Sequence, residues 1–212
     1  VLAIGGCAQI PTSGPVEKAA VRNPRDDPGF EIAAQPPREG APKQRILEGF
    51  MHAMASRGDY SAARAYLLPQ VRDTWDPTSS VQVYSELAPP DVTGDRAGVK
   101  GRLVGTLKGG IYTHADQPLT HDFGIVKDEH DQWRISKPPK GLLVSEQLFT
   151  TLYEPVTLYF LDARRKTLVP DQRYFLRSRL TAQAVMDALA RGPRAWLAPA
   201  SGTVVPTGAT RV

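Results

Sequence analysis

The spacing of apolar residues changes once along the first two thirds of this chain, from a helical period to a period of two. Between residues 43 and 57, apolar side chains recur every three or four positions, which places them on one face of a helix. They are Ile46, Leu47, Phe50, Met51 and Met54. Asp59 then predicts the N-cap of a second helix over 61–68, which Pro69 ends. The folded part of the chain is therefore expected to begin with two helices.

After residue 77, apolar and polar residues alternate, which is typical of half-buried strands. The predicted strands are 80–87, 97–108, 110–114, 120–127 and 132–137. Turn-forming residues separate them: Pro89-Pro90-Asp91, Gly109-Gly110, Asp116-Gln117-Pro118 and Asp128-Glu129-His130-Asp131. Helices followed by a meander of antiparallel strands predict an α+β domain over residues 42–140, with the helices packed on the sheet.

A hairpin is predicted at the start of a second unit, near residue 155. The run 156–161 is rich in β-branched and aromatic residues and predicts a strand, followed by a polar turn at 163–166. Residues 167–170 predict the return strand. Pro170 confines that strand to a sheet edge or to its own end, because proline cannot donate a ladder hydrogen bond.

A helix follows the hairpin, and Thr181 predicts its N-cap over the range 181–191. A β-like pattern resumes at 203–206. One hairpin, one helix and the start of a strand enclose little apolar volume. The second α+β unit, 155–212, is therefore expected to be truncated, with 141–154 as the linker that precedes it.

Cys7 is the only cysteine of the chain, so no intramolecular disulfide or CxxC metal site can form. A buried core role and a nucleophilic role both require ordered neighbours, which flanking glycines and prolines disfavour. The segment Leu2-Ala3-Ile4-Gly5-Gly6-Cys7 instead matches the end of a bacterial signal peptide and its lipobox, with small residues before the cysteine. We therefore favour a diacylglyceryl anchor on Cys7, with 1–6 as a remnant of the signal peptide. Two or three acyl chains anchor a protein stably, at about 0.8 kcal/mol per buried CH₂.

Prolines are concentrated between the cysteine and the first helix, with seven of them in residues 8–44. Such a segment buries too little apolar area to offset its ordering entropy, so residues 7–41 are expected to form an anchor and an extended stalk. The formal net charge of +4 suits an anionic membrane or cell-wall surface and is too small to indicate nucleic-acid binding. No stretch approaches the roughly 20 apolar residues of a membrane helix.

Longer motifs carry a resemblance to a known family. The lipobox, the proline-rich stalk and ILEGFMHAMASRGDYSAARAYLLPQVRDTWDP resemble the N-terminal region of actinobacterial LpqB lipoproteins. PVTLYFLDARRKTLVPDQRYF, VMDALARGP and TVVPTGATRV resemble the first half of a GerMN domain, which is second in those lipoproteins. The resemblance implies an NTF2/cystatin-like first domain with a curved antiparallel sheet, to which QWRISKPPKGLLVS would belong. It also implies that the native protein continues with the rest of the GerMN domain and a β-propeller.

Catalytic and ligand-binding residues were sought on the predicted strands. His114, Asp116, His121 and Asp122 lie around one predicted hairpin and could form a metal or acid–base site. His121 and Asp122 are adjacent on a strand and point to opposite faces, so turn and surface roles are favoured for this group. Trp75, Tyr84, Tyr112 and Trp133 could line a pocket, but a position in the core between helices and sheet is favoured.

Basic residues cluster in the second unit. They are Arg164, Arg165, Lys166, Arg173, Arg177 and Arg179. A solvated face explains such clusters, and contact with acidic cell-wall polymer, phospholipid headgroups or an acidic partner is the alternative.

The resemblance also predicts the function. It implies a lipoprotein without enzymatic activity or cofactor, anchored on the extracytoplasmic face of the cell membrane. Its partner would be the sensor histidine kinase of an MtrA/MtrB-type two-component system. The alternative is a module that binds or hydrolyses a cell-wall fragment in the cavity of the first domain.

Overall fold

The computed structural model describes residues 34–56, 59–94 and 96–203, and these lie within one compact unit, Glu31–Val212. Most of the predicted anchor and stalk, with Cys7, falls outside the described residues. Residues 34–41 are described and have no regular secondary structure, yet they pack on the following domain. The Tyr66 hydroxyl donates to the Gln35 carbonyl at 2.9 Å, and the Gly40 amide donates to Gln132 Oε1 at 2.7 Å. This end of the predicted stalk is therefore part of the folded domain.

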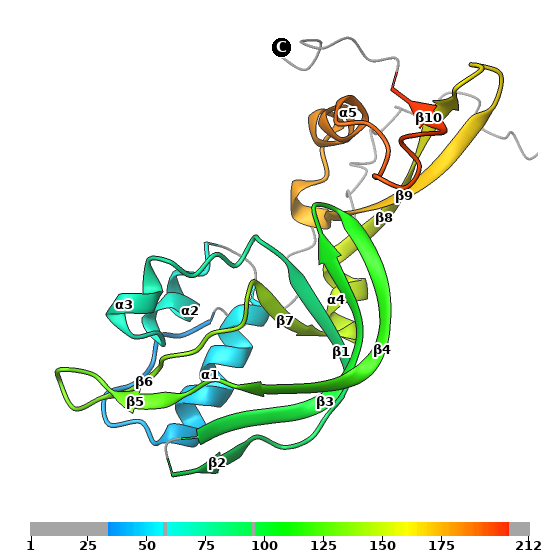
Figure 1. Ribbon diagram of the computed structural model, residues 1–212. Helices are drawn as coiled ribbons and strands as arrows, with labels where there is room; N and C mark the ends of the chain where they lie inside the picture. The colour runs from blue at the N-terminus through cyan, green and yellow to red at the C-terminus, as the bar shows by residue number, and fades with distance from the viewer. Residues whose placement is uncertain (1–33, 57–58, 95, 204–212) are drawn as a thin grey trace, which may run out of the picture. The chain divides into compact units, whose positions relative to one another are not determined.

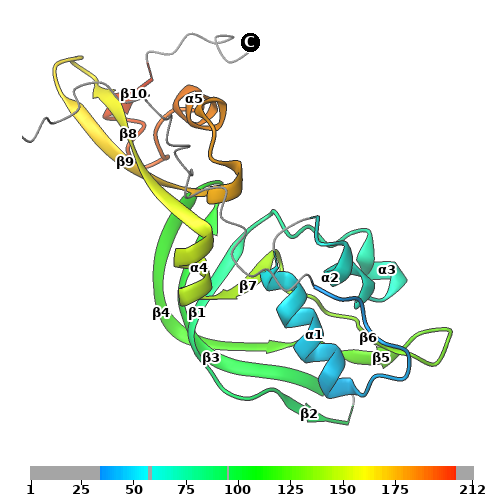
Figure 2. The same cartoon turned by 180° about the vertical axis from the view of Figure 1, so that it is seen from behind.

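A five-stranded sheet forms the first module, which we define as residues 34–152. Its strands are β1 (Val81–Leu87), β2 (Asp91–Thr93), β3 (Arg96–Lys108), β4 (Ile111–Asp122) and β7 (Leu142–Ser145). β1 and β2 pair with successive parts of one edge of β3, and β4 pairs with its opposite edge. β7 pairs with β1. Only the β1–β7 pair is parallel. β3 and β4 bend together, so that the sheet curves around the helix α1 (Figures 1 and 2). The α+β class and the curved antiparallel sheet are confirmed.

The helices α1 (Lys43–Ala55) and α2 (Ser61–Ala65) begin at the predicted positions, but α2 is shorter than predicted. Pro69 does not end α2, which stops at Ala65. It is the first residue of α3 (Pro69–Arg72), where the missing amide hydrogen is not needed. The predicted N-cap is wrong, because the cap of α2 is Tyr60, which makes no side-chain cap hydrogen bond. Asp59 lies one residue earlier, and its Oδ1 accepts from the Ser61 amide at 2.9 Å.

The predicted turn at 116–118 is wrong, because β4 continues through these residues, with an irregularity in its pairing with β3 between His114 and Gln117. β4 is an edge strand that pairs only with β3. An edge strand tolerates Pro118, because one side of its backbone has no ladder partner to supply. The remaining short strands, β5 (Ile125–Lys127) and β6 (Trp133–Ile135), form a separate two-stranded sheet.

The predicted linker over 141–154 is a strand and a helix in the structure. β7 pairs with β1, and α4 (Glu146–Leu152) begins at Ser145, whose Oγ accepts from the Leu148 amide at 3.2 Å. The buried residues Leu142, Leu143 and Val144 provide the reason: they are an apolar run just long enough to add one strand to the sheet.

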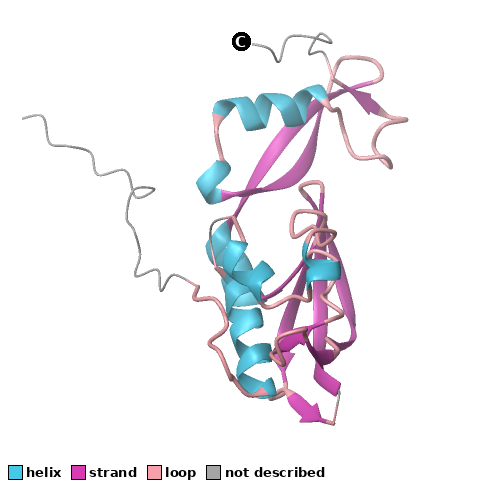
Figure 3. Cartoon of the chain, turned by 90° about the vertical axis from the view of Figure 1, so that its left-hand side faces the viewer, coloured by secondary structure: helices cyan, strands magenta, loops and turns pink. Residues whose placement is uncertain are grey.

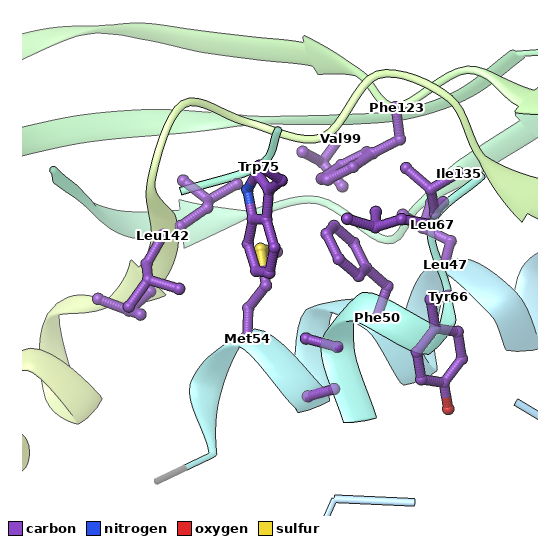
Figure 4. Close-up of a cluster of buried hydrophobic side chains, with 14 of the residues drawn as sticks. Leu47, Phe50, Met54, Tyr66, Leu67, Trp75, Val99, Phe123, Ile135 and Leu142 are labelled. Atoms are coloured by element: carbon purple, nitrogen blue, oxygen red, sulfur yellow. The ribbon is translucent and has the colours of Figure 1, made fainter. Parts of the chain in front are cut away.

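Aromatic side chains fill the space between α1 and the sheet. Phe50 lies 5.7 Å from Trp75 and 5.9 Å from Phe123, measured between ring centroids. Figure 4 shows Met54, Leu67 and Ile135 among the side chains around them. The indole of Trp75 donates to the Pro139 carbonyl at 3.0 Å, which satisfies its one polar group inside the core.

The second module, residues 153–203, is a three-stranded sheet with a helix on one face (Figure 3). Its strands are β8 (Tyr153–Asp162), β9 (Leu168–Leu176) and β10 (Ser201–Gly202), in the order β10-β8-β9. A single 3-10 turn, η2 (Arg177–Arg179), leads into α5 (Ala182–Ala190), whose N-cap Thr181 accepts from the Ala184 amide at 3.1 Å. Leu158 and Phe160 of β8 pack against Ala188 of α5.

Aromatic rings also join the two modules. Phe149 of α4 stacks on Tyr153 at 4.8 Å and lies 5.1 Å from Tyr112 of β4 and 5.4 Å from Tyr174 of β9. We call these four residues the aromatic junction. The Tyr174 amide donates to the Gly110 carbonyl at 2.7 Å, which adds a backbone contact between β9 and the turn that precedes β4.

Candidate functional site: a tyrosine-lined cleft

A cleft of about 590 Å³ opens beside the aromatic junction. Apolar side chains of both modules line it, among them Met54, Val81, Leu107 and Val144, and three tyrosines line it as well: Tyr60, Tyr153 and Tyr174. The polar lining includes Asp59 and Arg179. An apolar lining with a few polar groups, within this range of volumes, is typical of sites that bind small molecules or single side chains.

Tyr60 enters the cleft from a backbone conformation that is unusual for its type. Its φ is 61°, in the left-handed region, and it directly precedes α2. Its ring meets Trp75 edge to face at 6.4 Å, and its carbonyl accepts from the Arg64 amide at 2.9 Å. A bulky residue in this region costs about 1–2 kcal/mol, and such residues are found preferentially at functional sites.

The hydroxyls of Tyr60 and Tyr153 remain protonated over a wide pH range. The pKa of Tyr153 is raised to about 12, mainly by burial and also by the nearby Tyr60, while Arg179 acts in the opposite direction. Burial also raises the pKa of Tyr60, and Arg179 again acts in the opposite direction. Both groups are therefore neutral hydrogen-bond donors at ordinary pH.

Arg179 is the cation of the cleft. It is exposed on η2, and no ion pair joins it to a carboxylate among the residues that the structure describes. Its neighbour Arg177 is different, because its guanidinium pairs with Glu154. A guanidinium with five donors, next to two tyrosine hydroxyls and without an acidic partner in the described part of the chain, fits an anionic group.

The predicted basic residues of the second unit lie at opposite ends of the β8–β9 hairpin. Arg164, Arg165 and Lys166 are exposed in the β8–β9 turn, whereas Arg177 and Arg179 follow the far end of β9. The strand register puts these two ends about 27 Å apart.

Arg173 is a correction to the sequence prediction, since it is only 6% exposed and cannot contact a partner at the surface. Its guanidinium donates to Asp171 Oδ2 at 2.7 Å and to the Gly192 carbonyl at 3.1 Å. Arg194 also donates to Asp171, at 2.5 Å from its Nε. This buried network connects β9 to the loop after α5, so the role of Arg173 is structural.

The four predicted acid–base residues lie on β4 and outside the cleft. His114 contacts the ring of Tyr112 at 4.9 Å, and Asp116 pairs with Arg102 at 2.5 Å. His121 Nε2 lies 3.0 Å from the Lys137 carbonyl. The Gly124 amide donates to Asp122 and lowers the pKa of that carboxyl, so Asp122 is a carboxylate at neutral pH. Within the described ranges, no group of three His, Cys, Asp or Glu side chains could hold a metal ion.

The aromatic residues expected in the core are there. Trp75 is buried, and Tyr84, Tyr112 and Trp133 are half-buried against the same core. The tyrosines of the cleft were not predicted, because residues 60, 153 and 174 share no motif and become neighbours only through the fold. Over the described part of the chain, no helix is both long and apolar enough to cross a bilayer.

Comparison with known proteins gives one consistent result. Residues 36–150 match the family described as lipoprotein LpqB, N-terminal domain. Lipoprotein LpqB of Cutibacterium acnes (strain DSM 16379 / KPA171202) is 34% identical over 209 residues, covering 97% of this chain and 35% of the relative. Lipoprotein LpqB of Rhodococcus opacus (strain B4) is 30% identical, covering 94% of this chain and 34% of the relative. The chain thus spans about a third of the length of these curated relatives. No solved structure matches it.

Proposed function

Because this chain belongs to the LpqB lipoprotein family, we propose that it is an accessory subunit of a sensor histidine kinase, held at the extracytoplasmic face of the cell membrane. Cys7 would carry the lipid, and the folded modules would bind the extracytoplasmic part of an MtrB-type kinase without catalysing a reaction. In this proposal the protein regulates cell-envelope homeostasis through the kinase.

The cleft is the observation that carries the proposal. It combines a guanidinium that has no carboxylate partner among the described residues with the hydroxyls of Tyr60 and Tyr153 and an apolar lining, and both modules contribute to it. An acidic side chain of a partner would accept hydrogen bonds from Arg179 and from the hydroxyls, while its neighbours pack on the apolar lining. A binding event here would contact both modules at once, which suits a regulatory protein.

The partner can be tested by measuring the affinity of this chain, with Cys7→Ser, for the purified extracytoplasmic domain of the kinase. Arg179→Gln should weaken binding about tenfold or more, the effect of losing a charge-assisted hydrogen bond at an interface. Arg45→Gln is the matched control, because Arg45 is exposed on α1 and does not line the cleft. An intact chain that does not bind the kinase domain, or equal losses in both variants, would refute the proposal.

The lipid anchor has its own test, independent of the partner. Mass spectrometry of the protein from its native host should show an acylated N-terminal Cys7, and the mass of an unmodified residue before Cys7 would exclude the anchor.

A cell-wall fragment is the second candidate occupant, because the cleft volume also suits a small ligand. Titration with a soluble muramyl peptide should then shift the NMR signals of Tyr60 and Tyr153 and leave those of His121 unchanged. Saturable binding of the peptide that excludes the kinase domain would favour this function over the first. Hydrolysis of the peptide would require groups other than the β4 histidines and aspartates, which lie outside the cleft.

A further inference from the structure

Near the β8–β9 turn, the outer face of the second-module sheet is apolar and exposed. Residues that lie opposite each other on β8 and β9 share a face. α5 covers the face of Leu158 and Phe160. Near the turn, the opposite face carries Tyr159 paired with Pro170 and Leu161 paired with Leu168. Tyr159 is 55% exposed and Leu168 59% exposed, and none of the outward residues of the two strands carries a charge.

The turn at the end of this face is strongly cationic. Arg164, Arg165 and Lys166 are exposed, and none of them forms an ion pair with a carboxylate described in the structure. The neighbouring acid, Asp162, is engaged within the turn: its Oδ1 accepts from the backbone amides of Lys166 at 2.7 Å and Thr167 at 3.0 Å. The turn is therefore a hydrogen-bonded loop that presents three cations next to an apolar face.

We propose that the β8–β9 turn and its outer face dock on a bilayer that contains anionic phospholipids. Cations at a membrane surface are attracted by anionic headgroups, while exposed tyrosine and leucine side chains are stabilised where the headgroups meet the acyl chains. The hairpin has both components, with the cations in its turn and the apolar side chains on the adjoining strands. A soluble polyanion would use the cations and leave Leu168 and Tyr159 without a role, so the charge and the apolar face together favour the bilayer. The inference does not depend on a kinase partner.

Vesicle co-sedimentation of the full chain, with Cys7→Ser to remove any lipid, tests this proposal. Vesicles of equal parts phosphatidylglycerol and phosphatidylcholine should bind the chain, and phosphatidylcholine alone should bind it weakly. The triple variant Arg164→Gln, Arg165→Asn, Lys166→Gln should lose about 100-fold in affinity for the anionic vesicles. Asparagine is chosen at 165 because Arg165 has a φ of 55°, which asparagine tolerates.

Matched variants separate this surface from general charge and hydrophobicity. Arg45→Gln, Lys100→Gln, Lys140→Gln removes the same charge from exposed positions of the first module and should reduce affinity only a fewfold. Leu168→Ser should weaken binding about tenfold. Met186→Ser should have little effect, because Met186 is an exposed residue of α5, on the other side of the sheet.

Trp196 supplies a second readout. It is 71% exposed and lies four residues before Ala200, whose carbonyl accepts from the Ala163 amide in the turn. It is therefore within about 13 Å of the turn, and anionic vesicles should shift its emission to shorter wavelength, an effect lost in Trp196→Phe.

Three results would overturn the proposal. The first is equal binding to anionic and neutral vesicles. The second is normal vesicle binding by Leu168→Ser, combined with competition by soluble polyphosphate, which would assign the cations to an acidic polymer. The third is a dimer in sedimentation velocity that Leu168→Ser dissociates, which would assign the face to a second copy of the chain.

Discussion

Gly141 shows how a single residue allows a strand to join the sheet. Its φ is 77°, and a Cβ at this position would collide with the Ser80 carbonyl. The adjacent Leu142 amide donates to that carbonyl at 2.9 Å, which starts the pairing of β7 with β1. Gly141→Ala should lower the free energy of unfolding by about 3 kcal/mol, from backbone strain and the collision together.

Gly40→Ala is the control for this prediction, because Gly40 has a similar φ of 70° and open space around it. Gly40→Ala should lower the free energy of unfolding by the backbone strain alone, about 1–2 kcal/mol. Urea unfolding followed by circular dichroism measures both variants, and equal losses would show that the collision at Gly141 is relieved.

Asp171 stabilises the second module through its charge. Burial alone would raise the pKa of this carboxyl, but the hydrogen bonds from Arg173 and Arg194 outweigh burial and hold the pKa below its ordinary value. Asp171→Asn leaves two guanidinium groups without their carboxylate and should cost about 3–5 kcal/mol. Asp187→Asn, at a half-buried position on α5 whose Oδ1 accepts from Gln183 Nε2 at 2.8 Å, should lower the free energy of unfolding by less than about 1 kcal/mol.

The same carboxyl predicts a pH dependence. A lowered pKa in the folded state gives stability that is complete above the unfolded value of about 3.9 and is lost as the pH falls through the folded value. Urea unfolding at a series of acidic pH values should show a shallower loss in Asp171→Asn than in the unaltered chain. Parallel curves would mean that Asp171 has an ordinary pKa in the folded protein.

Residue roles were predictable where the local pattern determines them. The position of Trp75 between helix and strand predicts a place in the core, and the residue is buried there. The sequence predicts a solvated face for Arg173, although Asp171 lies two positions before it, and residues two apart on a strand share a face. The sequence contained this signal, but burial of the pair depends on α5 and on Arg194, which are distant in sequence.

At the scale of elements, β7 is the part of the first module that sequence reasoning assigned to a linker. Leu143 is 2% exposed in this strand. Leu143→Ala should lower the free energy of unfolding by about 2–5 kcal/mol. Leu152→Ala, at a half-buried position that ends α4, should cost less. Chemical denaturation compares the two, and a small effect of both would support a linker over 141–154.

The elements that were predicted correctly are those with long periodic patterns or strong end signals. α1 has five apolar residues at helical spacing, and α5 has a threonine cap and a terminal glycine. β7 has four residues and pairs in parallel with a strand about 60 positions earlier, so its short apolar run does not by itself show which strand it joins. The turn prediction at Pro118 is wrong for a related reason. Proline is tolerated in a strand at the edge of a sheet, and the sequence does not show which strands lie at the edge.

At the scale of the whole molecule, Phe149 connects the modules. It contacts Tyr112 of the first module and Tyr153 and Tyr174 of the second. Phe149→Ala should lower the free energy of unfolding by about 3–5 kcal/mol. It should also separate the unfolding of the two modules into distinct transitions. The tryptophans distinguish them, because Trp75 and Trp133 report on the first module and Trp196 on the second.

Urea titrations of Phe149→Ala can follow each module separately by tryptophan fluorescence. A Trp196→Phe background reports on the first module, and a Trp75→Phe, Trp133→Phe background reports on the second. Coincident midpoints in both backgrounds would show that the junction does not couple the modules. The cleft lies beside this junction and could not be predicted from the sequence, since residues 60, 153, 174 and 179 meet only when both modules are in contact.

The proline in β4 has a consequence for how copies of this protein coexist. The proposed lipid anchor would concentrate copies of the protein in two dimensions, where neighbouring sheets can pair edge to edge and aggregate. β4 is a 12-residue edge strand, long enough to act as a template for such pairing. Pro118, near the middle of that strand, has no amide hydrogen to donate. One residue that misled the turn prediction thus serves the solubility of the folded protein, by interrupting its longest unpaired edge.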